Sequence, residues 1–113
     1  MDHHQVKVKT VIDFSHFEIG ETITGSVYIS EPETFNAELD LHVVKRSVMK
    51  EDEVLDTLSL NPIGDNISKE IRKIPFMIVP DDRWEIEDDE RLFIQTINRG
   101  IQKVIQEVEI MYG

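Results

Sequence analysis

The sequence predicts an all-β protein whose two sheets pack as a β-sandwich of about seven strands. Apolar and polar residues alternate along most of the chain, which is the period of half-buried strands. Short clusters of turn-forming residues separate these segments, a spacing typical of sandwiches. The 113 residues suit a single domain, 1–113, that is large enough to bury its own core.

The first expected strand carries Val6, Val8, Ile12 and Phe14 on one face. Lysine and aspartate alternate with these residues and indicate a solvent-facing side. The segment that follows contains Gly20, which adopts a positive φ at little steric cost. We therefore expect the chain to bend at this glycine.

The second expected strand runs from about Thr22 to Ser30 and has a glycine at its centre. Gly25 shares a face with Ile23, Val27 and Ile29, so it points inward among aliphatic side chains. A glycine at such a position favours a bulge, a bend or a bulky neighbour that needs the missing side-chain volume.

Three further strands are expected in the middle of the chain. Alternation continues from Phe35 through Ala37, Leu39 and Leu41 to Val43, and a shorter strand follows at 54–60. A dense turn signal at 61–66 separates it from a strand at 68–79.

The strand at 68–79 places Ile74, Phe76 and Ile78 on its inner face. Pro75 has no amide hydrogen to donate, so we expect it on a sheet edge or at a bulge.

The end of the chain contains one more clear strand and one ambiguous segment. The strand is at 92–98, and a tight reversal follows in which Asn98 and Gly100 both tolerate positive φ. Residues 101–112 fit helical spacing, and they also fit a strand with one apolar face that Gln106 interrupts. That face would consist of Val104, Val108, Ile110 and Tyr112. The many β-branched residues favour the strand.

Several stretches resemble the arrestin-like β-sandwich family, and in particular the bacterial sporulation-control proteins. They are FEIGETITGSVYI at 17–29, AELDLHVV at 37–44, SKEIRKIPFMIVP at 68–80 and LFIQTIN at 92–98. The order and spacing of Gly20-Glu21, Gly25, Pro75-Phe76 and Pro80 carry the resemblance, although Ile19 stands where the family often has proline. The resemblance implies an immunoglobulin-like sandwich and a regulatory role in sporulation or a related process.

Arrestin-like proteins usually comprise two sandwiches, and this chain has room for one. We therefore expect a homo-oligomer, with a dimer rebuilding the two-lobed arrangement. Family functions that need both sandwiches are not carried over to this chain.

The charge balance disfavours several partners. A formal net charge of −11 repels phosphate backbones, so no nucleic-acid role is expected. No apolar run is long enough for a membrane span. The chain has no cysteine, which excludes disulfides and thiolate chemistry and fits a cytoplasmic location.

An acidic connection at 81–90 is the main candidate for a ligand site. Its carboxylates include Asp81, Asp82, Glu85, Asp88 and Asp89, the kind of oxygen ligand that calcium prefers. The EF-hand spacing is absent, so a solvated acidic loop is the simpler interpretation. We expect Trp84 to anchor this loop on the sandwich.

No cofactor and no catalytic centre are expected. His16 and His42 are isolated in sequence, whereas zinc needs three or four convergent ligands. No nucleophile elbow and no glycine-rich phosphate loop are present.

These observations together predict a non-catalytic protein-interaction or scaffold module that binds another protein through a sheet face or edge. The alternative is a calcium-binding or small polar ligand-binding module that uses the acidic loop.

Overall fold

The computed structural model describes residues 8–30, 38–60, 65–66 and 71–113, with only the backbone described for 65–66. These ranges form eight strands and one short 3-10 helix. The elements are β1 (Val8–Ile12), β2 (Ile23–Ser30), β3 (Leu39–Ser47), β4 (Glu53–Ser59), β5 (Asp65–Asn66), β6 (Ile71–Ile78), η2 (Asp82–Trp84), β7 (Glu90–Asn98) and β8 (Lys103–Ile110). No helix in the described ranges is both long and apolar enough to cross a membrane.

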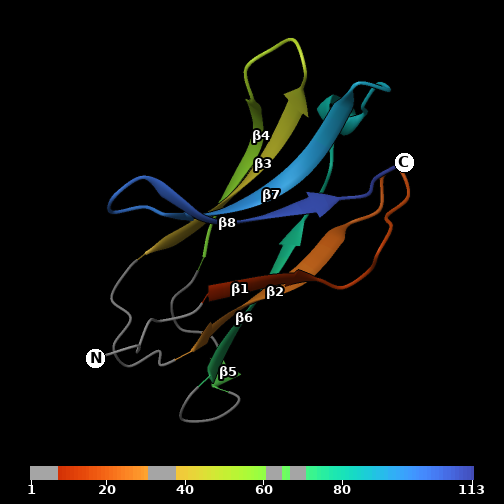
Figure 1. The fold of residues 1–113 in the computed structure, drawn as a ribbon. Coiled ribbons are helices and arrows are strands. Elements are labelled where there is room, and N and C mark those ends of the chain that lie inside the picture. The colour runs from red at the N-terminus through yellow and green to blue at the C-terminus, as the bar shows by residue number, and fades with distance from the viewer. Residues whose placement is uncertain (1–7, 31–37, 61–64, 67–70) are drawn as a thin grey trace.

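The strands form two four-stranded sheets in which every pair is antiparallel (Figure 1). Sheet I has the order β1-β2-β6-β5, and sheet II has the order β4-β3-β7-β8. Alternation along each strand gives each sheet one apolar face, and the two apolar faces pack against each other. The predicted all-β class and two-sheet arrangement are thus confirmed.

The core lies between the sheets and is built from the inner faces that the alternation predicts. Strands β2, β3 and β6 contribute their expected aliphatic residues, and Trp84 joins them from η2. Val6, Phe35 and Ala37 lie outside the described residues. The core side chains are Phe17, Ile23, Val27, Ile29, Leu39, Leu41, Val43, Leu55, Leu60, Ile74, Phe76, Ile78, Trp84, Leu92, Ile94, Ile110 and Tyr112.

Gly25 lies opposite Phe76 in the β2–β6 register, and the Phe76 ring occupies the space beside the glycine. A Cβ at this position would lie 2.6 Å from the ring and 2.4 Å from the Val11 carbonyl oxygen. The bulky neighbour expected beside Gly25 is therefore Phe76. Pro75 pairs with Ser26 of β2, while the two residues of β5 pair only with Arg72 and Lys73. In the described residues, the other side of Pro75 thus has no strand partner.

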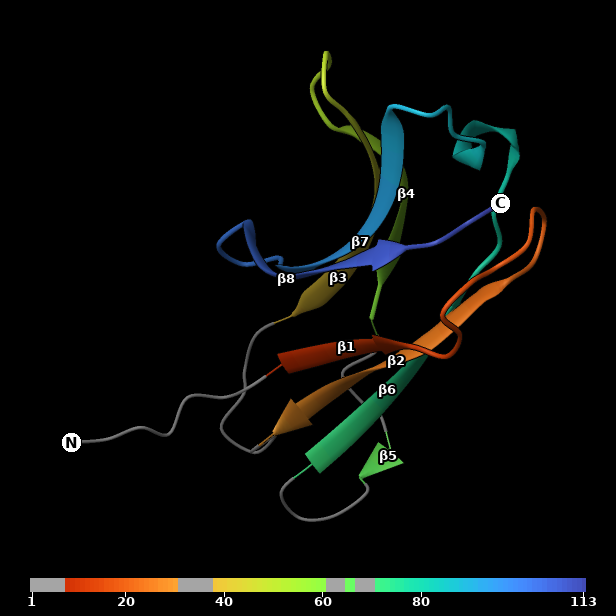
Figure 2. The same ribbon diagram turned by 45° about the vertical axis from the view of Figure 1, so that its right-hand side comes forward.

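One side of the sandwich is closed by contacts between β1 and β8, which lie side by side in both views (Figure 2). The backbone N–H of Thr10 donates to the side-chain carbonyl of Gln106. The hydroxyl of Thr10 also shares a 2.5 Å hydrogen bond with that of Thr96, and both threonines are buried. Gln106 therefore accepts a hydrogen bond from the backbone of β1, an edge strand of sheet I. The residue that interrupts the apolar pattern thus has a structural role.

The segment after β1 is held against the segment after β8. The Phe17 N–H donates to the Met111 carbonyl at 2.8 Å, and the Gly113 N–H donates to the Phe17 carbonyl at 2.9 Å. Gly20 has the expected positive φ, 86°, and its N–H donates to the Tyr112 hydroxyl at 2.7 Å.

Three details differ from the sequence predictions. Residues 103–110 form a strand, but a register shift pairs Thr96 with Gln106 and Ile97 with Val104, so Val104 turns to the outer face and is 44% exposed. Phe14 lies beyond the end of β1 and is also exposed. In the β7–β8 turn the positive φ, 53°, belongs to Gln102 and not to Asn98 or Gly100.

Candidate functional site

The outer face of sheet I consists of rows of side chains that cross β1, β2 and β6. One row is Val11, Ser26 and Pro75, because Ser26 pairs with both of the others. A neighbouring row contains Thr24 and Met77. Side chains in such rows are direct neighbours, with Cβ atoms about 5 Å apart. The face therefore has short hydroxyl side chains on β2 and apolar side chains on both flanking strands.

A shallow hollow of about 440 Å³ opens on this face. Met77 of β6 is 65% exposed. Three more large apolar side chains are exposed nearby in the sheet: Val11 of β1, Ile71 of β6 and Val79 directly after β6. Exposed apolar surface grouped around a hollow is the usual mark of an interaction site, whereas single exposed apolar residues are not. The hollow is lined by Asp13, Thr24, Gly25, Ser26, Lys73, Pro75, Phe76 and Met77.

Two lysines lie next to the hollow in a further row across the sheet. Tyr28 pairs with Lys9 on one side and with Lys73 on the other, so the two lysines flank Tyr28 in the sheet. Neither lysine forms an ion pair with the carboxylates whose side chains the structure describes. The face carries charges of both signs, because Asp13 lines the same hollow and Asp65 of β5 pairs with Lys73 in the sheet register.

The outer face of sheet II is different because its charges pair with one another. Arg46 contacts Asp52 at 3.0 Å and Glu107 at 2.7 Å, and its guanidinium lies 4.3 Å from the centre of the Phe93 ring. Hydrogen bonds from Arg46 and Gln95 lower the pKa of Glu107. The same pairing raises the pKa of Arg46 above its ordinary value.

Arg99 makes a second set of ion pairs at the other end of sheet II. It contacts Glu38 and Asp40, each at 2.7 Å. Its hydrogen bonds are the main cause of a lowered pKa at Asp40, to which Ser59 also contributes. Thus Arg46 and Arg99 satisfy their charges internally, whereas Lys9 and Lys73 of sheet I have no ion-pair partner among the side chains that the structure describes.

In the acidic connection, Asp81 is engaged locally by a neighbouring arginine. Asp81 caps η2 by accepting from the Arg83 N–H at 2.8 Å, and it forms an ion pair with the same arginine at 2.6 Å. These bonds lower the pKa of Asp81. Glu85 contributes its backbone carbonyl to Lys45 at 2.9 Å. Trp84 is fully buried and contacts Tyr112 edge-on, so it does anchor the loop.

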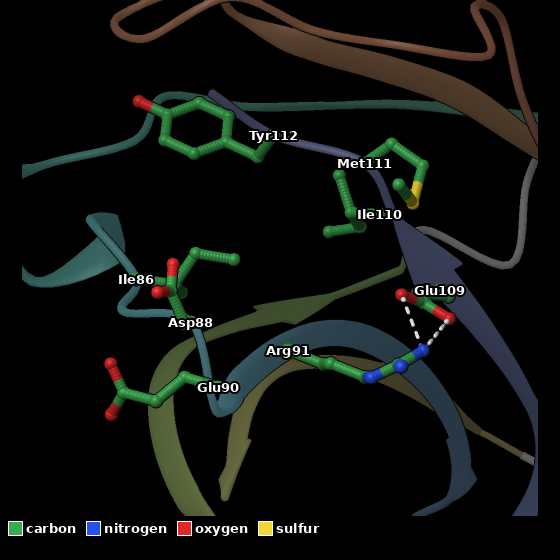
Figure 3. Close-up of a pocket in the computed structure, with 8 residues that line it drawn as sticks. All are labelled: Ile86, Asp88, Glu90, Arg91, Glu109, Ile110, Met111 and Tyr112. Carbon is green, nitrogen blue, oxygen red and sulfur yellow. Dashed lines mark hydrogen bonds and ion pairs between the residues drawn. The ribbon is translucent and has the colours of Figure 1, made fainter.

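A cleft of about 240 Å³ lies between this connection and the end of β8 (Figure 3). Asp88, Glu90 and Glu109 line it, and Arg91 reaches across to Glu109 at 3.5 Å. Figure 3 shows the Glu90 carboxylate directed away from this ion pair. Asp82 and Asp89 do not line the cleft.

No group of three or more histidine, aspartate or glutamate side chains could hold a metal ion within the described part of the chain. His16 lies beside Gly113, with its Nε2 2.6 Å from the Gly113 carbonyl oxygen. His42 lies on the outer face of sheet II, opposite Gln95. The structure therefore does not bring these two histidines together.

The residues that form the hollow were mostly missed by the sequence reasoning. It identified Gly25, Pro75 and Phe76 as structural residues, but not Met77 or the two lysines as a surface. A signal was present: positions 71, 75, 77 and 79 place apolar residues on the face that should be polar.

The chain matches no protein-family model, and the comparison with curated proteins finds no significant match.

Proposed function

We propose that this protein is a non-catalytic interaction module that binds an acidic segment of another protein on the outer face of sheet I. The observation that carries this proposal is the hollow beside Met77 and Pro75, with exposed apolar residues and two lysines around it. Apolar contacts supply most of the binding free energy at such surfaces. Lys9 and Lys73, which form no ion pair with the carboxylates whose side chains the structure describes, favour carboxylates and disfavour basic partners.

The arrestin-like identity of the sandwich is part of the same proposal. It is supported by the two antiparallel sheets and by the positions of the residues that carry the resemblance. Gly20 makes a backbone turn with positive φ, and Gly25 admits the Phe76 ring. A regulatory role in sporulation follows from the resemblance alone. Deleting the gene in a spore-forming host and counting heat-resistant spores tests it.

Parallel affinity captures test the binding face. Wild-type protein, Met77→Ser and Ile101→Ser are immobilised, and the bound proteins are quantified by mass spectrometry. Ile101 is a matched control, because it is also 65% exposed but lies in the β7–β8 turn. We expect Met77→Ser to lose a partner that Ile101→Ser retains.

The captured partner is then purified and titrated against each variant. Truncation of a central apolar contact is expected to weaken binding about tenfold. Reversal of the charge in Lys73→Glu is expected to weaken binding further and to reduce its salt dependence. A purified partner that binds wild type and both variants equally refutes the proposed face.

A further inference from the structure

The turn between β3 and β4 presents an apolar tip with no packing partner in the described fold. Val48 and Met49 are 86% and 84% exposed, the highest values among the large apolar side chains of the described residues. Figure 1 shows this hairpin extending beyond the other strands of sheet II. Turns are usually built from glycine, proline and short polar residues, so two adjacent apolar residues here need another explanation.

An ion pair fixes the base of the hairpin, whereas the charges beside the tip have no ion-pair partner among the described side chains. Arg46 of β3 binds Asp52 at 3.0 Å and so ties together the two sides of the turn. Lys50 and Glu51 follow Met49 directly and form no ion pair with the side chains that the structure describes. The hairpin therefore presents an apolar tip flanked by one cation and one anion.

This tip is complementary to the hollow on sheet I. The hollow offers apolar contacts at Pro75 and Met77, and it has the ammonium of Lys73 and the carboxylate of Asp13 in its lining. We propose that the β3–β4 tip of one copy docks into the sheet I hollow of a second copy. Met49 contacts the apolar lining, Glu51 faces Lys73, and Lys50 faces Asp13. This inference rests on the face assigned under the proposed function.

The two surfaces cannot meet within one molecule. Both views show the β3–β4 hairpin extending away from sheet I (Figures 1 and 2). The contact is therefore between copies and joins two different patches. It either closes reciprocally in a two-fold dimer, with each tip in the hollow of the other copy, or repeats from copy to copy into a ring or an open chain. An acidic chain can tolerate this contact because each charge at the tip meets the opposite charge in the hollow, Glu51 at Lys73 and Lys50 at Asp13.

Sedimentation velocity at about 100 µM, where a contact with a Kd on the order of 10 µM is populated, tests the proposal. Wild type and the Ile101→Ser control should both associate, whereas Met49→Ser and Met77→Ser should each be monomeric. Mixing these two monomeric variants should restore a one-to-one dimer, because the intact tip of one fits the intact face of the other. A monomeric wild type, or a mixture that stays monomeric, overturns the proposed contact between tip and hollow.

Charge reversal tests the pairing of Glu51 with Lys73. Lys73→Glu should weaken association at least about tenfold, and the double variant Lys73→Glu, Glu51→Lys should regain it. Lys103→Glu is the control, since it makes the same charge change on β8. If the double variant stays as weak as Lys73→Glu, the assigned pairing is wrong.

The same variants separate this inference from its alternatives. If Met49→Ser abolishes sedimentation with phosphatidylcholine–phosphatidylglycerol vesicles but leaves self-association unchanged, the tip is a lipid contact and the proposal fails. If the protein does not self-associate but the binding of a purified partner still depends on Met77, a second copy is excluded as the occupant of the hollow. The proposed function then stands.

Discussion

Replacement of Gly25 by alanine is the sharpest test of how sheet I is packed. An added Cβ would lie 2.4 Å from the Val11 carbonyl oxygen and 2.6 Å from Cζ of Phe76, whereas ordinary contact begins at 3.4 Å. The overlap with the carbonyl is thus 3.4 minus 2.4, or 1.0 Å. Because this oxygen belongs to the backbone of β1, it cannot move without displacing the strand.

The expected cost follows from these contacts. Overpacking of a core costs about 1–3 kcal/mol, and a clash with backbone lies at the upper end of this range. Alanine restricts the unfolded chain more than glycine does, which offsets about 0.5–1 kcal/mol. We therefore expect Gly25→Ala to lower the free energy of unfolding by about 2 kcal/mol. With an m-value of about 1.5 kcal/mol/M, the urea midpoint falls by more than about 1 M.

Urea unfolding followed by the fluorescence of Trp84 measures this change, because Trp84 is fully buried. Gly100→Ala is the control. Its Cβ would lie 3.4 Å from a side-chain oxygen of Asn98, and we expect a change within about 0.5 kcal/mol. A Gly25→Ala variant as stable as Gly100→Ala would refute the packing of Phe76 against β2.

Three further predictions concern the hydrogen bond between Thr10 and Thr96, the ion pair between Glu107 and Arg46, and the acidic connection at 81–90. Thr96→Val leaves the buried Thr10 hydroxyl without its partner and should lower the free energy of unfolding by about 1–3 kcal/mol. In thermal unfolding, the double variant Thr10→Val, Thr96→Val should be more stable than Thr96→Val. An equal loss of stability in both variants would contradict the hydrogen bond between the two hydroxyls. The pKa of Glu107 lies below its ordinary 4.5 in the folded protein. Its contribution to stability is therefore present above pH 4.5 and is lost as the pH falls through the lowered pKa. Glu107→Gln should flatten the acid limb of a curve of stability against pH, and an unchanged limb would contradict the pairing of Glu107 with Arg46. Millimolar calcium should leave the Tm unchanged, since Asp81 is engaged by Arg83; a rise in Tm that Asp88→Asn removes would support the calcium-binding alternative instead.

Alternation predicted the inner faces of β2, β3 and β6 because the side-chain period of a strand is a local property of the sequence. It failed where pairing is decided by a distant strand. The alternation places Val104 on the same face as Val108 and Ile110, but the register shift against β7 turns it to the opposite face. Gln106 looked like an interruption, and its role depends on Thr10, 96 residues away. Neither effect has a signal within a short window of sequence.

The candidate site was only partly predictable for a similar reason. The sequence shows exposed-face apolar residues at Pro75 and Met77, and these could have been recognised as a surface. The hollow itself requires the order β1-β2-β6, which brings Asp13 and Lys73 to the same face. The internal pairing of Arg46 also needed the fold, because Glu107 lies 61 residues further along the chain.

Hydrogen–deuterium exchange of the protein with its purified partner tests the central claim most directly. Binding through the outer face of sheet I predicts added protection in β2 and β6, centred on residues 24–28 and 73–77, with sheet II unchanged. Protection confined to residues 81–90 or to the outer face of sheet II would contradict it.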